Sequence, residues 1–265
     1  MHTTAVTVAV HVLSWNLDGL TTRRLDRRAE EACVAMVLGQ TLREAVEGKP
    51  SRPPPQVIAL QEVVKRIHLS TIRPHLEAAG FALWPREPAR EDGDYSLIAA
   101  RPPWTLVRGR DQRFAESPLA RRWVEVRLQH SDGTQLRVIT AHMESLRSGA
   151  GARAAQTREI AALLEDPDAP PTVFLGDTNL RASEWRALEP DLAMDDAFTL
   201  AGRPAGHSAT WYPRDDHGKR TSDRGYRFDR IWIDPGHEWT VQRFQLRHHP
   251  RISDHAALEA HLATH

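Results

Sequence analysis

The sequence predicts an α+β fold in which two packed, mostly antiparallel β-sheets are flanked by helices. Three observations lead to this prediction: strand-like runs outnumber helical segments, helices do not alternate strictly with strands, and no shift in composition marks a domain boundary. With 265 residues, of which 40% are hydrophobic, the chain can bury a large core. We therefore expect a single domain spanning residues 1–265.

The N-terminal part contains two predicted strands around a helix. The segment VTVAVHV alternates valine with other residues, which is the period of a strand with one strongly apolar face. Apolar side chains then recur at helical spacing at Ala29, Ala32, Cys33, Met36 and Val37. The four prolines of GKPSRPPPQ stop helical structure, and VIAL predicts a short buried strand that ends at Gln61 and Glu62.

The rest of the chain predicts more strands and two longer helices, at about 64–79 and about 150–165. FALW, YSLIAA and WTLVRG are predicted strands, and Asp132-Gly133 between two alternating runs predicts a hairpin. The remaining predicted strands are TVFLGD, RFDRIWI, WTVQRFQLR and AALEAHL. A short helix is expected after TVFLGD, and a long polar loop at about 201–225.

The charge balance excludes a strong overall field for nucleic acid. The chain has 35 basic and 35 acidic residues, so anion binding must come from a local patch. Its one cysteine, Cys33, excludes an internal disulfide and a cysteine zinc cluster and fits a reducing compartment. No apolar run has membrane-spanning length, and the N-terminal segment lacks a basic start. These features predict a cytoplasmic protein without membrane contact.

Polar side chains follow five of the apolar runs. They are Asn16, Gln61 with Glu62, His142, Asp177 with Asn179, and Asp254 with His255. Strands of one sheet that end together would bring these groups into one cleft. A turn or a helix cap also explains each cluster alone. Caps, however, do not require this combination of oxygen ligands, imidazoles and nearby arginines.

This combination indicates a site for attack on a phosphate ester. Carboxylate and amide oxygens suit Mg²⁺, with Mn²⁺ as the alternative, whereas zinc would need thiolates or more histidines at ligand spacing. The sequence has neither an H-E-x-x-H segment nor a cysteine pair. A hard divalent cation among carboxylates, imidazoles and arginines stabilises the negative charge that develops on a phosphate under attack.

Six segments occur in the order seen in the endonuclease/exonuclease/phosphatase superfamily: LSWNLDGL, ALQEV, TAHMESLRSG, FLGDTNLR, RFDRIWI and ISDH. The match extends from Ser14 to His255. Within the superfamily the sequence most resembles the 5′-tyrosyl-DNA phosphodiesterase branch, although Ser14, Leu146 and Ala182 depart from the pattern of that branch. The resemblance implies the DNase I-like fold, a four-layer α/β/β/α sandwich.

The resemblance also implies a metal site. Glu62 would be the main protein ligand of Mg²⁺, and Asn16 beside it would bind the metal or the phosphate. Asp254 would complete the metal shell through water.

A catalytic set is implied in the same way. Asp177, helped by Asn179, would orient or deprotonate the attacking water, and His255 is the alternative base. His142 and His255 would donate hydrogen bonds to the phosphate oxygens. Asp229 would hold one side of the His255 ring.

Four further residues are implied to contact the substrate. Ser145, Arg147 and Arg181 would grip the scissile phosphate or its neighbour. Trp211 would wall the substrate channel by stacking. Arg181 is equally explained as a surface charge at a helix start, and Trp211 as a core residue.

The implied function is Mg²⁺-dependent hydrolysis of a phosphodiester at a DNA 5′ end, in DNA repair, with a phenolic leaving group such as the tyrosine of a protein adduct. The expected partner is a DNA 5′ end, single-stranded or carrying a protein adduct, and the expected state is a monomer. A generic or abasic-site endonuclease and a small phosphoester hydrolase of the same superfamily are the alternatives. A non-catalytic nucleic-acid-binding module is the alternative of another class, and the presence of Glu62, His142, Asp177 and His255 argues against it.

One pattern suggests a dinucleotide-binding fold instead. Gly149, Gly151 and Ala154 spell G-x-G-x-x-A before a predicted helix. In such folds the strand turns sharply at the first glycine. Here HMESLRS separates the strand from Gly149, so the tight turn is missing and we do not favour this interpretation.

Overall fold

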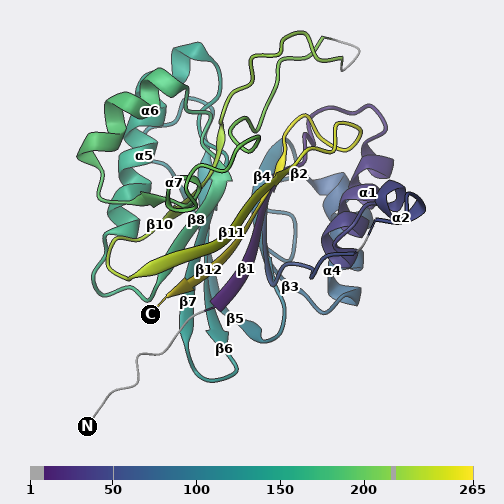
Figure 1. Cartoon of the computed structure of the whole chain (residues 1–265), viewed down its shortest axis with the longest axis horizontal. Coiled ribbons are helices and arrows are strands. Elements are labelled where there is room, and N and C mark those ends of the chain that lie inside the picture. Colours follow the sequence, from purple (N-terminus) through teal and green to yellow (C-terminus); the bar gives the residue numbers. More distant parts are fainter. Residues whose placement is uncertain (1–8, 50, 216–218, 265) are drawn as a thin grey trace.

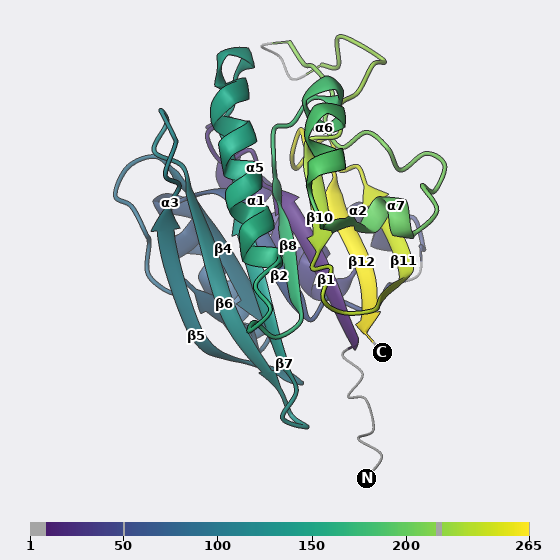
Figure 2. The same ribbon diagram turned by 90° about the vertical axis from the view of Figure 1, so that its left-hand side faces the viewer.

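Two six-stranded β-sheets pack face to face in the computed structural model, which describes residues 9–49, 51–215 and 219–264. Helices cover the outer face of each sheet, and the order helix, sheet, sheet, helix is visible in Figures 1 and 2. The predicted four-layer α+β architecture is confirmed.

The first sheet has the strand order β11-β12-β1-β2-β4-β3. Its strands are β1 (Ala9–Asn16), β2 (Val57–Val64), β3 (Ala82–Trp84), β4 (Asp94–Ala100), β11 (Trp239–Arg247) and β12 (Ala257–Thr264). Only β1 and β2 pair in parallel, and every other neighbouring pair in this sheet is antiparallel.

The second sheet has the order β5-β6-β7-β8-β10-β9. Its strands are β5 (Trp104–Arg113), β6 (Arg122–His130), β7 (Gln135–Ala141), β8 (Thr172–Asp177), β9 (Asp195–Asp196) and β10 (Asp229–Ile233). Here β7 and β8 form the one parallel pair. The predicted hairpin joins β6 to β7, where Gly133 has a φ of 94° and Thr134 N–H donates to Asp132 Oδ1.

Helices connect the parallel strands and cover the sheets. On the outer face of the first sheet lie α1 (Leu25–Leu38), α3 (Lys65–Ile67), the π-helical segment His68–Ile72 and α4 (Arg73–Ala78), with α2 (Leu42–Val46) beside α1. On the second sheet lie α5 (Ala150–Leu164) and α6 (Ala182–Leu188), while α7 (Ala197–Leu200) contacts β10 and β11. The 3₁₀ segments are Arg147–Gly149 and Glu189–Asp191.

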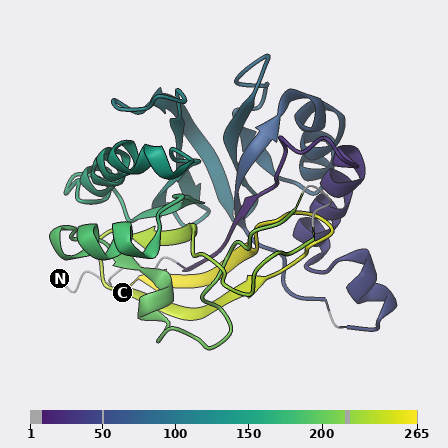
Figure 3. The ribbon, with the colours of Figure 1, turned by 90° about the horizontal axis from the view of Figure 1, so that it is seen from above.

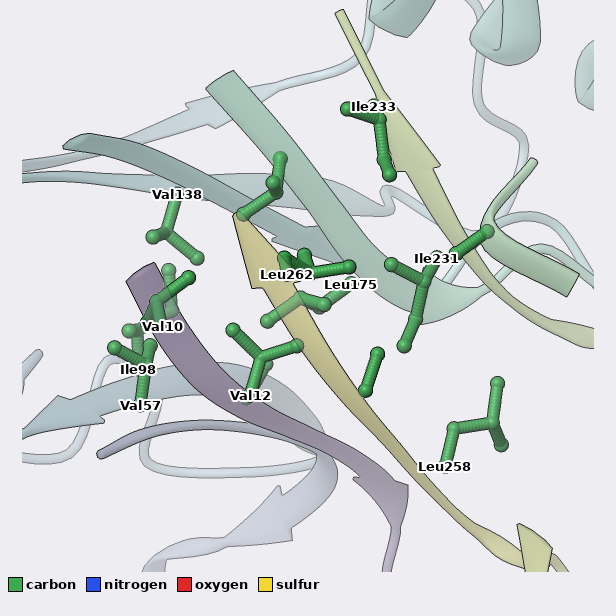
Figure 4. Close-up of a cluster of buried hydrophobic side chains, with 14 of the residues drawn as sticks. Val10, Val12, Val57, Ile98, Val138, Leu175, Ile231, Ile233, Leu258 and Leu262 are labelled. Atoms are coloured by element: carbon green, nitrogen blue, oxygen red, sulfur yellow. The ribbon is translucent and has the colours of Figure 1, made fainter. Parts of the chain in front are cut away.

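The central core lies between the two sheets. Figure 4 shows side chains of both sheets packed together, among them Val10, Val12, Leu175 and Ile231. The alternate residues of β1 pack on the other side, against the helices, so both faces of β1 are buried, whereas the sequence predicted one apolar face. The first two valines of VTVAVHV, Val6 and Val8, lie outside the described residues.

The helix α1 carries the single cysteine into the helix-side core. Cys33 is fully buried, and burial, with a smaller contribution from Glu30, raises the pKa of its thiol to about 12. The prediction that this segment forms an amphipathic helix on a core is confirmed by α1.

The helix predicted at about 64–79 exists but is not regular. A π-helical segment, His68–Ile72, separates α3 from α4. Pro74 is the second residue of α4 and has no N–H to donate to the preceding turn. The Nδ1–H of His75 donates to the Thr71 carbonyl at 2.8 Å, so a side chain supplies a donor to this turn.

Two glycines offer a matched test of the packing. A Cβ on Gly109 in β5 would lie 2.3 Å from atoms of the Trp84 ring, whereas a Cβ on Gly151 in α5 would meet open space. We expect Gly109→Ala to lower the free energy of unfolding by about 1–3 kcal/mol through overpacking. Gly151→Ala should raise it by about 0.5–1 kcal/mol through helix propensity. Urea unfolding followed by circular dichroism measures both, and an unchanged midpoint for Gly109→Ala would contradict the described Trp84 contact.

Candidate active site

The polar residues that follow the predicted strands meet at one end of the sandwich, but the strands come from both sheets. Asn16 and Glu62 lie at the end of β1 and within β2 of the first sheet, and Asp177 ends β8 of the second. The expectation that one sheet would supply the cleft is therefore wrong. The antiparallel strands β10 and β12 contribute at their starts, through Asp229 and through His255 just before β12.

A hydrogen bond between the sheets lies at the centre of this site. The side-chain amide of Asn16 donates to Asp177 Oδ2 at 2.9 Å and to Glu62 Oε1 at 3.1 Å. The other oxygen of Asp177 accepts from Asn179 N–H at 2.9 Å. Burial raises the pKa of Asp177, but the charges of His255 and His142 and these hydrogen bonds outweigh burial, so the net pKa lies below the usual value.

The backbone around Glu62 has an uncommon conformation. Glu62 has a φ of 52°, and the pairing of β2 with β4 shifts register between Leu60 and Val63. Such a β-bulge re-aims a side chain relative to the regular strand. A Cβ on Gly19 would lie 1.9 Å from the Glu62 carbonyl oxygen, so the loop after β1 approaches this close only because residue 19 is glycine.

His255 lies between two carboxylates. Its Nδ1 is 2.9 Å from Asp229 Oδ2, and its Nε2 is 3.8 Å from Asp177 Oδ2. Burial lowers the pKa of His255, but Asp229 and Asp177 raise it well above the usual value. Because Nδ1 is engaged by Asp229, Nε2 is the nitrogen that faces the site.

His142 has a similar carboxylate partner from another strand. Its Nδ1 is 3.2 Å from Asp94 Oδ2, and its Nε2 is 3.6 Å from Asp177 Oδ2. Burial lowers the pKa of His142, whereas the hydrogen bond to Asp94 and the Asp177 charge raise it, and the net change is upward. Arg121 donates to Asp94 at 2.9 Å, and burial of Asp94 is outweighed by His142 and Arg121, which lower its pKa to about 2.

The residues assigned to the substrate lie beside this centre. Arg181 donates to the Asn179 carbonyl, and its guanidinium lies 5.8 Å from the Phe228 ring. Arg147 is exposed in the 3₁₀ turn before α5. Ser145 is half-buried in the loop before that turn, and buried Arg153 fixes this loop by donating to the carbonyls of residues 144–146.

Trp211 bridges two parts of the site. Its Nε1–H donates to Asp254 Oδ2 at 2.6 Å, and its backbone forms bridges with Tyr226 and His255. The ring is half-buried and lies 5.4 Å from the Phe228 ring. The side chain thus orients Asp254 and is partly accessible, whereas a pure core residue would have neither property.

The oxygen ligands at this site fit a hard divalent cation. Glu62 Oε2 has no hydrogen-bond partner within the described residues, and Asp18 and Asp254 lie nearby. Burial is the main cause that raises the pKa of Asp18 to about 6, and the negative charges of Asp254 and Glu62 add to it. Carboxylate oxygens at such a density suit Mg²⁺ or Mn²⁺.

A second group has metal-like spacing. Within the described ranges, ligand atoms of Asp177, Asp229 and His255 lie within 4.8 Å of one another. The hydrogen bonds from Asn16, Asn179 and His255 already occupy these carboxylates. This donor set therefore fits a proton-bearing imidazole better than a metal.

The sequence alone does not identify the residues that hold the two histidines and the loops of the site. Asp94 and Arg121 were not singled out, because Asp94 precedes an apolar run and Arg121 lies between strands, where charged residues are ordinary. Thr210 was also missed, although its hydroxyl oxygen accepts from the N–H groups of Phe228 and Asp229. Arg153 could not be identified either, because an arginine on a helix is usually exposed and nothing in the sequence marks this one as buried.

Residues 13–255 match the model of the Endonuclease/Exonuclease/phosphatase family. The chain belongs to this family. In the part of the chain that the structure describes, none of the helices is both long and apolar enough to cross a membrane.

The similar curated relatives share one name. Tyrosyl-DNA phosphodiesterase 2 of Gallus gallus is 27% identical over 231 residues, covering 86% of this chain and 57% of the relative. The Homo sapiens protein of the same name is 25% identical over 227 residues, covering 84% of this chain and 57% of the relative. This chain thus spans little more than half the length of these relatives.

Solved structures share the fold. The crystal structure of D. rerio TDP2 complexed with a single-strand DNA product has a TM-score of 0.75 at 22% identity, over 96% of this chain and 98% of that chain. The human Nocturnin catalytic domain with bound sulfate has a TM-score of 0.69 at 17% identity, over 98% and 97% of the two chains. At this identity the likeness establishes the fold, which agrees with the DNase I-like architecture expected from the motifs.

The contact between Asp94 and His142 gives a direct prediction. In Asp94→Asn, loss of the carboxylate charge should lower the pKa of the His142 ring, because the largest contribution that raises it is removed. An NMR titration of the histidine rings without added metal measures this shift. The His255 ring, whose partner is Asp229, serves as the internal control and should titrate as in the wild type. An unchanged His142 pKa would contradict the described pair.

Proposed function

We propose that this chain is a metal-dependent phosphodiesterase that hydrolyses a phosphodiester at a DNA 5′ end, with a 5′-phosphotyrosyl bond as its substrate and a 5′ phosphate as its product. The proposal treats the chain as one catalytic domain that acts as a monomer, with Mg²⁺ as the cofactor. It is supported by the name shared by the curated relatives and by the single-strand DNA product named for the D. rerio structure.

The observation that carries the proposal is the convergence of Asn16, Glu62, His142, Asp177 and His255 from both sheets. An anionic group that accepts from the two imidazole Nε2 atoms would lie beside Asp177, because these atoms are 3.6 and 3.8 Å from Asp177 Oδ2. A phosphodiester has the required single negative charge and two free oxygens to accept hydrogen bonds. A fold of this family without the acids and imidazoles would support only binding.

The proposed reaction divides the work among these residues. Asp177, held by Asn16 and by the Asn179 N–H, orients the water that attacks phosphorus. The water oxygen forms a bond to phosphorus, its proton passes to Asp177, and the bond from phosphorus to the phenolic oxygen breaks, with the electron pair leaving on the phenolate. His142 and His255 donate from Nε2 to the phosphate oxygens, whose negative charge grows in the transition state.

Metal binding is assigned to Glu62, with Asn16 beside it and Asp254 contributing through water. The cation would supply charge neutralisation at the phosphate oxygens. Trp211 holds Asp254 in position through its indole N–H. A phenolate leaves readily, so the chain has little need of an acid at the leaving oxygen.

The first test is release of tyrosine from a 5′-phosphotyrosyl oligonucleotide, with Mg²⁺ or with EDTA. We expect cleavage only with the metal. Asp177→Asn should lower kcat by about 10²- to 10⁴-fold, because the amide of the mutant cannot accept the proton of the attacking water. The exposed Asp168→Asn is the matched control and should retain wild-type activity.

Unmodified and abasic duplexes run in parallel with the tyrosyl substrate. Cleavage of either of these while the tyrosyl strand survives would overturn the proposed substrate and favour an endonuclease. Wild-type protein that cleaves none of them would favour the binding module or the small-phosphoester hydrolase.

The role of Arg181 is tested separately. The proposal has the Arg181 guanidinium contact substrate phosphate, so Arg181→Gln should raise KM for the tyrosyl oligonucleotide by roughly tenfold. Arg158→Gln removes an equivalent charge from the exposed side of α5 and should leave KM unchanged. Equal KM values for the two variants would assign Arg181 to the surface of α6.

A further inference from the structure

An arginine-lined groove opens beside the proposed reaction centre, on the side of α1. Its volume is about 720 Å³, and it lies between the loop after β1, the starts of α1 and α2, and the loop before β12. Seven arginines and three carboxylates line it, so its charge is strongly positive although the whole chain is neutral. Asp18, Ser253 and Asp254 form its boundary with the site described above.

Several of these guanidinium groups are available to a ligand. Arg24 and Arg251 are exposed, and neither side chain forms a hydrogen bond or an ion pair within the described ranges of the chain. Arg27 and Arg43 are paired with glutamates, yet their side chains are 72% and 69% exposed. Exposed ion pairs of this kind contribute little free energy, so a phosphate can replace the glutamate as the partner of the arginine at little cost.

The walls of the groove are held together before any ligand binds. Arg28 donates to Asp18 Oδ2 at 3.0 Å and to the Ile252 carbonyl at 2.9 Å, which ties the loop after β1 to the loop before β12. Arg214 donates to the Pro250 carbonyl at 3.0 Å on the same side. A preformed site saves the ordering entropy that a flexible one would lose on binding.

The shape of the backbone also favours this placement. Arg24 has a φ of 51°, in the left-handed region that disfavours residues with a Cβ, and α1 begins directly after it. Such conformations persist where surrounding structure holds them and are frequent at binding sites. Arg28 holds this segment, because its side chain donates to the carbonyls of Thr21 and Arg23 and its backbone N–H donates to the Arg24 carbonyl.

We propose that this groove binds the phosphate backbone of a nucleic-acid strand that continues past the scissile phosphate on the α1 side. The inference rests on the proposed function for the position of the scissile phosphate. Arginine matches phosphate with paired N–H donors, and a row of phosphates at backbone spacing requires several cations along one groove. Arg147 precedes α5 and Arg181 caps α6. In Figure 3 these green helices lie across the strands from α1, which is drawn in dark purple.

The test is binding of a fluorescein-labelled single-stranded oligonucleotide of about twelve nucleotides, measured by anisotropy in EDTA. The double variant Arg24→Gln/Arg251→Gln should bind about tenfold more weakly, and the slope of log K against log salt should fall by about 1.4, because two phosphate contacts are lost. The double variant Arg108→Gln/Arg158→Gln removes the same charge from exposed sites outside the groove and should bind like the wild type.

A second measurement separates this inference from the proposed function. Thymidine 5′-(p-nitrophenyl phosphate) carries one phosphate and reaches only the reaction centre, so its hydrolysis should be equal in the wild type and both double variants. Wild-type binding and salt slope in Arg24→Gln/Arg251→Gln would overturn the groove while leaving hydrolysis intact. If the wild type hydrolyses neither the ester nor the tyrosyl oligonucleotide but the groove variant loses binding, the groove is supported and the proposed function fails.

A polyglutamate peptide of equal charge tests the other polyanion. If Arg24→Gln/Arg251→Gln lowers the affinity for DNA more than the affinity for polyglutamate, the groove is a nucleic-acid site. The reverse order would overturn it in favour of an acidic peptide.

Discussion

The hydrogen bond from Asn16 to Asp177 is the interaction on which the rest of the site depends. It joins the last residue of a strand in one sheet to the last residue of a strand in the other. Both groups are buried, and Asp177 Oδ1 accepts from Asn179 N–H of its own segment, whereas Oδ2 accepts from Asn16 of the other sheet. Packing of the two sheets is therefore needed to complete the polar centre, because a buried carboxylate oxygen without a donor is costly.

The topology explains why these ends coincide. Among the strands that the structure describes, each sheet has one parallel pair, β1 with β2 and β7 with β8, and parallel neighbours end at the same edge. The connections that return the chain contain α1 and α5, which cover the outer faces. The antiparallel strands β10 and β12 start where the parallel strands end. His142 therefore contacts Asp94, and His255 contacts Asp229, although each pair is far apart in the sequence.

Much of this arrangement could be predicted from the sequence. The strands other than β9, the hairpin at Asp132-Gly133 and the helix α5 follow from local patterns, and the motifs identified the polar centre. The sequence did not predict β9, which has two residues and is too short to show alternation. The division of that centre between two sheets could not be predicted, because alternation along a strand does not specify its neighbours. The pairs formed by Asp94 and Arg121 depend on contacts between segments remote in sequence, and the π-turn before Pro74 depends on how a helix accommodates a missing donor.

The buried thiol of Cys33 has a practical consequence. A thiol must ionise and be reached by the reagent before it reacts, and Cys33 is hindered on both counts. A cysteine introduced at an exposed position would thus react with a dye much faster than Cys33, so Cys33 need not be replaced first. Paired dyes on either side of the arginine-lined groove would then report distances within the folded chain as an oligonucleotide is added.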